Sequence, residues 1–156
     1  MNELKATFNR PADTTAYASG DLVANDTVAG NVVPMQFTGA SHMAIRRARI
    51  MKSGTGVGGA SFRIHIYDLP PTPANGDNGA WLTNGLAPNY QGFIDVTVDK
   101  VFTDGAGGQG APTVGQEITI QDPGDQVIYA LLEARGAYTP ASGETFTVFL
   151  ELEQFE

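Results

Sequence analysis

Short stretches in which apolar and polar residues alternate are the feature of this sequence that most limits its possible folds. Every second residue is apolar over 62–66, 94–98 and 146–152. Residues two apart point to the same face of a β-strand, so each stretch predicts a half-buried strand. Helix-type spacing is never sustained for three turns without a glycine, a proline or a strand-like alternation. The pattern therefore predicts an all-β protein.

Nineteen glycines and nine prolines divide the chain into short segments. Strands are expected over residues 4–9, 17–24, 32–37, 42–52, 62–67, 94–99, 117–121, 126–134 and 146–153. Pro34 predicts an edge position or a bulge for the third strand. This pattern favours an antiparallel double-sheet sandwich of jelly-roll type, preceded by an extended N-terminal arm. An immunoglobulin-like sandwich is the rival, but its landmarks are missing because Trp81 lies in a loop and the chain has no cysteine.

The distribution of charge limits the possible partners. Residues 1–100 carry eight acidic and eight basic side chains, whereas residues 101–156 carry nine acids and only Arg135, so the net charge of −8 comes from the last third. Such a surface repels phosphates, and we expect no nucleic acid as a partner. No signal-peptide pattern and no membrane-length apolar run occur, so we expect a soluble protein, made in the cytoplasm, that does not bind membranes.

The segment over residues 8–25, FNRPADTTAYASGDLVAN, is polar and irregular and runs into an expected strand. It resembles the N-terminal segment of small β-structured virion proteins of tailed bacteriophages, among them the capsid decoration or cement proteins. The resemblance implies a homotrimer on the outer surface of a phage head, bound to the major capsid protein and stabilising contacts between its subunits. We divide the chain into a docking arm over residues 1–16 and one sandwich domain over 17–156. The residues expected to dock the arm are Leu4, Phe8, Arg10, Pro11, Asp13 and Tyr17.

Two further groups are candidates for an interface. Arg46, Arg47 and Arg49 concentrate positive charge on one expected strand, although a regular strand would turn Arg46 to the opposite face unless a bulge intervened. They are expected to pair with acidic strand residues, or otherwise to meet an acidic capsid patch. Trp81 and Tyr90 lie in a long loop, where Trp81 either anchors a partner or covers an open end of the sandwich.

Side chains that carry catalysis or bind metals form no recognisable pattern. His42 and His65 are isolated on expected strands, without the spacing of a zinc or Ser-His-Asp site. The segments 54–59 and 105–110 match G-x-G-x-x-G, but strands follow them rather than helices, so we interpret both as loops. Residues 75–79 lack the acidic ligands of a calcium loop and predict a turn.

Carboxylates on neighbouring strands give no stronger indication of catalysis. Asp95, Asp99, Glu151 and Glu153 are expected on solvent-facing sides, and residues 122–125 predict a β-turn. We therefore expect no enzymatic activity, no catalytic residues, no metal and no cofactor. The alternative function is a carbohydrate-binding or fibre/tail-associated β-sandwich module. Its aromatic contacts would come from Tyr67, Trp81, Tyr90 and Tyr138.

Overall fold

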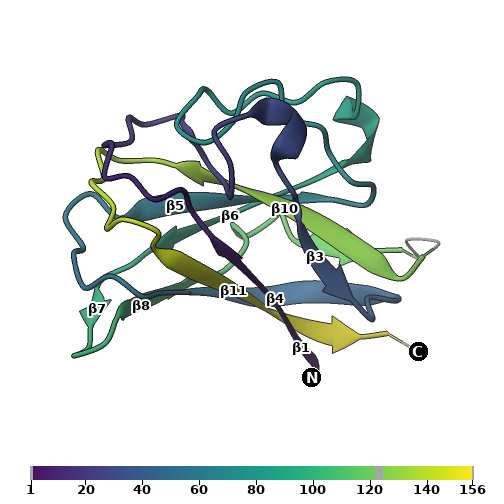
Figure 1. The fold of residues 1–156 in the computed structure, drawn as a ribbon. Coiled ribbons are helices and arrows are strands. Elements are labelled where there is room, and N and C mark those ends of the chain that lie inside the picture. The colour runs from purple at the N-terminus through teal and green to yellow at the C-terminus, as the bar shows by residue number, and fades with distance from the viewer. Residues whose placement is uncertain (1, 122–124, 156) are drawn as a thin grey trace.

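The computed structural model describes residues 2–121 and 125–155, which form two antiparallel β-sheets packed face to face (Figure 1). The first sheet contains, in spatial order, β1 (Asn2–Asn9), β11 (Thr145–Gln154), β4 (Met43–Lys52), β8 (Ala106–Gly110) and β7 (Lys100–Val101), with β9 (Ile118–Ile120) also paired to β4. In the second sheet, β2 (Leu22–Val23) and β3 (Met35–Thr38) pair with β10 (Val127–Ala134), followed by β5 (Ser61–Tyr67) and β6 (Tyr90–Thr97). Two short 3-10 turns, Ala29–Asn31 and Ala87–Asn89, lie in the connections.

The order of the strands is that of a jelly roll. In the first sheet β1 pairs with β11, β11 with β4 and β4 with β8; in the second β3 pairs with β10, β10 with β5 and β5 with β6. Two sheets connected in this order form the double Greek key of a jelly roll. The expected antiparallel double-sheet sandwich is confirmed.

The N-terminal residues do not form the free arm expected over 1–16. Residues 2–9 are β1, which pairs with β11 along its whole length. Leu4, Ala6 and Phe8 point inward and pack against the core. The strand expected over 4–9 is confirmed, whereas the separate docking arm expected over 1–16 was wrong for residues 2–9, because their apolar side chains join the core and their backbone joins the first sheet.

Aromatic rings fill one part of the space between the sheets. The ring of Phe62 meets Tyr138 and Phe146 edge-on, each with centroids 5.4 Å apart, and Phe8 stacks on Phe146 at 5.6 Å. Contacts of this geometry stabilise a core by about 0.5–1.5 kcal/mol beyond the burial of their area. Phe8 therefore fastens the N-terminal strand to the centre of the sandwich.

The glycine-rich segment 105–110 contains a strand, β8, and is not the loop that its composition predicted. A Cβ atom on Gly108 would lie 1.9 Å from the carbonyl oxygen of Thr97, and one on Gly110 would lie 2.0 Å from that of Asp95. Glycine at these positions lets the backbone of β8 approach that of β6. The two sheets thus come into backbone contact along this side of the sandwich.

The remaining differences from expectation are local. Residues 17–24 contribute two isolated bridges, Tyr17 with Tyr138 and Asp21 with Ala80, and the short strand β2 rather than one continuous strand. Pro34 directly precedes β3, which lies at a sheet edge as the proline predicted. The turn expected over 122–125 falls largely on residues 122–124, which lie outside the described residues.

The long connection from β5 to β6 lies over the outer face of the second sheet (Figure 1). Beneath it is a second, smaller apolar cluster that includes Leu22, Tyr67 and Leu131, with Trp81 and Tyr90 packed against it. This sheet is therefore covered on both faces where the loop crosses it.

Candidate interaction surface

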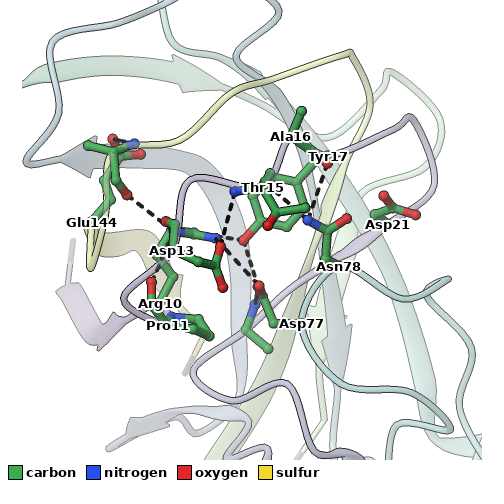
Figure 2. A network of polar contacts seen from close by, with 12 residues as sticks. Arg10, Pro11, Asp13, Thr15, Ala16, Tyr17, Asp21, Asp77, Asn78 and Glu144 are labelled. Atoms are coloured by element: carbon green, nitrogen blue, oxygen red, sulfur yellow. Dashed lines mark hydrogen bonds and ion pairs between the residues drawn. The ribbon is translucent and has the colours of Figure 1, made fainter.

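Residues expected to dock on a partner form a polar network at one end of the sandwich (Figure 2). Arg10 is only 2 % exposed. Its guanidinium donates to the Tyr17 hydroxyl at 2.8 Å and to the Asp13 carboxylate at 2.9 Å. It also donates to the backbone carbonyls of Pro11 and Ala141 at 3.0 and 3.2 Å. Arg10 and Tyr17 are buried, so the expectation that they contact a partner was wrong.

Asp77 completes this network from the long β5–β6 loop. The Tyr17 hydroxyl donates to Asp77 Oδ1 at 2.6 Å, and the Ala24 backbone N–H donates to the same atom at 2.9 Å. The Arg10 guanidinium lies 3.6 Å from Asp77 Oδ2. Burial raises the pKa of the Tyr17 hydroxyl and that of the Asp77 carboxyl. The buried pair compensates two charges that would each be costly alone, and it ties the segment after β1 to a loop far along the chain.

A second buried ion pair lies beside the first. The Lys52 ammonium is 3.6 Å from the Glu144 carboxylate and donates to the Gly54 carbonyl at 2.7 Å, while the Tyr138 hydroxyl donates to Glu144. Burial lowers the pKa of Lys52. The Arg10 backbone N–H donates to the Glu144 carbonyl at 3.0 Å and so links the two pairs. These charged groups are engaged with one another, and we interpret the whole set as a structural closure of this end of the sandwich.

The outer edge of β1 is different, because it leaves backbone groups unpaired. The Arg10 N–H bonds to Glu144, and the Thr145 carbonyl accepts from Ser53 on the side of β4. Pairing alternates along antiparallel strands, so the even-numbered residues of β1 turn their backbone groups toward β11 and the odd-numbered ones turn theirs outward. No backbone hydrogen bond joins the outward groups of Thr7 or Asn9 to another described residue.

A groove of about 450 Å³ runs beside this edge. Its walls come from β1 and from the segment that leads into β3, the edge strand of the other sheet. The described residues that line it are Ala6, Thr7, Phe8, Asn9, Asn25, Val33, Pro34, Met35 and Gln36. None of these carries a charge, and Val33 is 62 % exposed. The edge and the groove together are the candidate interaction surface.

The three neighbouring arginines of β4 are neutralised within the chain. Arg47 makes a two-pronged contact with Glu151, at 2.9 and 2.5 Å, Arg46 pairs with Glu153, and Arg49 pairs with Glu3 at 2.8 Å. A register shift opposite Arg46 is the bulge that allows Arg46 and Arg47 to share the outer face. Pairing with acidic strand residues was the preferred interpretation of these arginines, and the geometry agrees with it.

Trp81 and Tyr90 fold back onto the protein. The Trp81 ring stacks on His65 at 3.6 Å, and the Tyr90 hydroxyl is 2.9 Å from His65 Nδ1. His65 Nε2 lies 2.7 Å from Glu133. Trp81 thus folds back as one of the two alternatives proposed, but it covers a sheet face and not an open end of the sandwich.

Burial sets the protonation of this cluster. It lowers the pKa of His65 to about 4, more than the neighbouring Glu133 raises it, and it raises the pKa of Tyr90 to about 12. A neutral His65 fits the geometry, since Nε2–H donates to Glu133 and Nδ1 accepts from the Tyr90 hydroxyl. Tyr67 and Tyr138 are each 1 % exposed. Of the four aromatic residues considered for sugar binding, Tyr67 and Tyr138 are therefore closed to a ligand, while Trp81 and Tyr90 are partly exposed.

Sequence reasoning named Leu4 and Phe8 but missed their neighbours Thr7 and Asn9, and it missed the groove residue Val33. Alternation identified β1 as a strand, yet only its position at the edge of a sheet makes the backbone groups of its odd-numbered residues available to a partner.

Within residues 2–121 and 125–155 no group of three or more His, Asp or Glu side chains is placed to hold a metal ion. In the same residues no helix is long and apolar enough to cross a membrane.

Among the solved structures that this chain resembles are two distant likenesses. A chain of the acidic stable capsid structure of the Helicobacter pylori bacteriophage KHP30 aligns over 100 % of this chain and 94 % of its own, with 10 % identity and a TM-score of 0.33. A family two carbohydrate esterase from Cellvibrio japonicus aligns over 90 % of this chain but only 36 % of its own, with 13 % identity and a TM-score of 0.16. No family model and no curated protein matches the sequence.

Proposed function

We propose that this chain is a structural protein of a tailed-phage virion, a decoration protein that binds the outer surface of the head and stabilises contacts between major capsid subunits. The observation that carries the proposal is the open edge of β1 beside an uncharged groove, because it offers another polypeptide a place to attach to a rigid body. The sequence resemblance of residues 8–25 supports it, and this segment begins within β1.

We further propose that the protein acts as a homotrimer on the shell. Val101 and Phe102, at the tip between β7 and β8, are 54 % and 51 % exposed, and apolar side chains at such a tip suit contacts between copies. Many copies on a repeating lattice hold firmly even when each contact is weak. Light scattering of the eluted protein measures the mass directly: a trimer is expected, and a Phe102→Ser variant should dissociate.

The proposal includes no chemical reaction. His65 and Glu133 are each no more than 5 % exposed, and both are engaged in hydrogen bonds with their neighbours. The paired Arg10 and Asp77 are similarly enclosed. A substrate would have to displace these internal contacts in order to reach any of these four groups.

The test is to locate the protein on virions of the phage that encodes it. Immunogold labelling with an antibody against this chain is expected to mark the outer surface of the head, and purified protein added to shells lacking it should cosediment with them. Label on the tail or fibres would overturn decoration. Binding to a glycan array without binding to shells would instead favour the carbohydrate-binding module.

A further inference from the structure

We propose that the candidate interaction surface takes up an extended, uncharged segment of the partner polypeptide as an additional β-strand on β1. This inference rests on the proposed function, since it says how the decoration protein would be attached. It concerns only the edge of β1 and the groove beside it, whose described lining includes neither Arg10 nor Asp77.

The backbone of β1 provides the template. Thr7 and Asn9 turn their N–H and C=O groups outward, and an extended chain placed alongside satisfies them in the pattern of a sheet. Edge strands are commonly protected by charge, proline or a bulge. In β1 the charged residues Glu3 and Lys5 lie in the N-terminal half, while the half from Ala6 to Asn9 has none of these features.

The groove defines the chemistry of the segment. Its described lining has no formal charge, while the outer face of the same sheet is crossed by the ion pairs Arg47–Glu151 and Arg49–Glu3. A charged side chain entering the groove would lose water without gaining a partner. Phe8, Val33 and Met35 offer apolar contact, so the segment carries apolar side chains at alternate positions.

The length of the groove favours a capsid partner over a second copy of this chain. The β1 residues on its wall are Ala6 to Asn9, a stretch of about 13 Å at roughly 3.3 Å per residue. A strand this short buries far less than the roughly 800 Å² per partner of a stable interface. So short a contact is enough for stable attachment where a lattice presents the same segment many times, as the shell of a phage head does.

Two substitutions with matched controls test the mode of attachment on shells. Thr7→Pro removes an outward N–H and leaves the ladder to β11 intact, whereas Thr7→Ala keeps that N–H. Val33→Asp places a charge in the groove, and Val28→Asp places one on another valine, 57 % exposed, that does not line it. Thr7→Pro and Val33→Asp are expected to weaken shell binding at least about tenfold, the first because it loses one good hydrogen bond per site and the second because its charge loses water without gaining a partner. The two controls are expected to stay within about twofold.

A peptide titration tests the strand itself without shells. The probe is the blocked peptide acetyl-Thr-Val-Thr-Val-Thr-amide, and its control replaces both valines with lysine. The first peptide is expected to shift the amide resonances of Thr7 and Asn9 and to slow their hydrogen exchange, while the lysine peptide leaves them unchanged. In Thr7→Pro, which has no amide proton at residue 7, the shift at Asn9 should be lost.

The results separate the two proposals. Failure of the unmodified protein to bind shells overturns the decoration role, and the titration still decides the strand-addition site. Shell binding that survives both Thr7→Pro and Val33→Asp overturns strand addition while leaving decoration in place. A dimer lost on Thr7→Pro would assign the edge to a second copy of this chain and overturn the capsid partner. If Thr7→Pro fails to fold, Val33→Asp, whose side chain is exposed, gives the same decision.

Discussion

Arg10 and Arg46 show how strongly the surroundings of an arginine side chain decide what it contributes to stability. The Arg10 side chain is fully buried and lies beside the buried carboxylate of Asp77. Arg46 pairs with Glu153, but both side chains are about half exposed. Removing one partner of a buried pair leaves an uncompensated charge, whereas water replaces the partner of a surface pair.

We therefore expect Arg10→Gln to lower the free energy of unfolding by about 3–5 kcal/mol. Arg46→Gln, the matched surface change, should lower it by about 1 kcal/mol or less. Urea unfolding followed by circular dichroism measures both. Equal effects of the two substitutions would show that the Arg10 network does not hold this end of the sandwich together.

The sequence could single out Arg10 and Tyr17 but not their role. Their partners lie far along the chain: Tyr17 bonds to Asp77, 60 residues away, and Arg10 to the carbonyl of Ala141, 131 residues away. A polar segment looks alike in sequence whether its charges face solvent or one another. Only the closing of the jelly roll brings these residues together.

His65 gives the protein a predictable dependence on pH. Its pKa is lowered from 6.5 to about 4 in the folded protein, chiefly by burial. Above pH 6.5 His65 is neutral in both the folded and the unfolded protein, so it does not change the free energy of unfolding. As the pH falls from 6.5 to 4, the unfolded chain takes up a proton that the folded chain excludes, so stability falls. The groups facing His65 are Glu133 on β10, Tyr90 and Asp95 on β6, and Arg63 on its own strand.

We expect the free energy of unfolding to drop by about 3 kcal/mol between pH 6.5 and pH 4, at 1.36 kcal/mol per pKa unit. Urea unfolding at a series of pH values measures this slope. His65→Gln should flatten it, whereas His42→Gln, which changes the exposed histidine, should keep it. A ring titration near pH 6.5 for His65, observed by NMR, would contradict the burial argument.

At the scale of the element, alternation was a reliable guide and composition was not. The alternating stretches 62–66, 94–98 and 146–152 lie in β5, in or next to β6, and in β11. Strand β8 has no side-chain pattern because three of its five residues are glycine. It pairs with β4 and β7, and its glycines leave room for β6 of the other sheet. That close approach is a property of the packed sandwich and cannot be recognised in the segment alone.

Gly108→Ala tests that close approach. The added methyl group would meet the Thr97 carbonyl oxygen at 1.9 Å, so one of the two backbones must move. We expect a loss of about 1–3 kcal/mol, the usual result of overpacking. Gly56→Ala adds the same methyl group where no atom lies within 4 Å, and its effect should stay within about 0.5 kcal/mol. Thermal unfolding of the two variants side by side measures the difference.

At the scale of the whole molecule, β1 is the edge strand of the first sheet. One of its sides pairs with β11, and the other side is the open edge. Removing residues 1–16 would expose the edge of β11 and would take away Arg10, leaving Asp77 buried without its cation. Such a deletion cannot separate attachment from folding. Single substitutions on the outward side of β1 can, because they leave the ladder and the network in place.

Proteolysis distinguishes a strand that belongs to the sandwich from a free arm. Lys5 lies exposed in the middle of β1, and a protease must unpair the strand before it cuts there. We expect trypsin to cleave after Lys5 no faster than the whole protein unfolds, as followed by mass spectrometry. Arg10→Gln should speed this cut and the degradation of the rest of the chain by the same factor, because one cooperative unit is being opened. Rapid loss of residues 1–5 from an otherwise intact protein would instead mean that the N-terminal segment is held separately, and the strand template for a partner would then be missing.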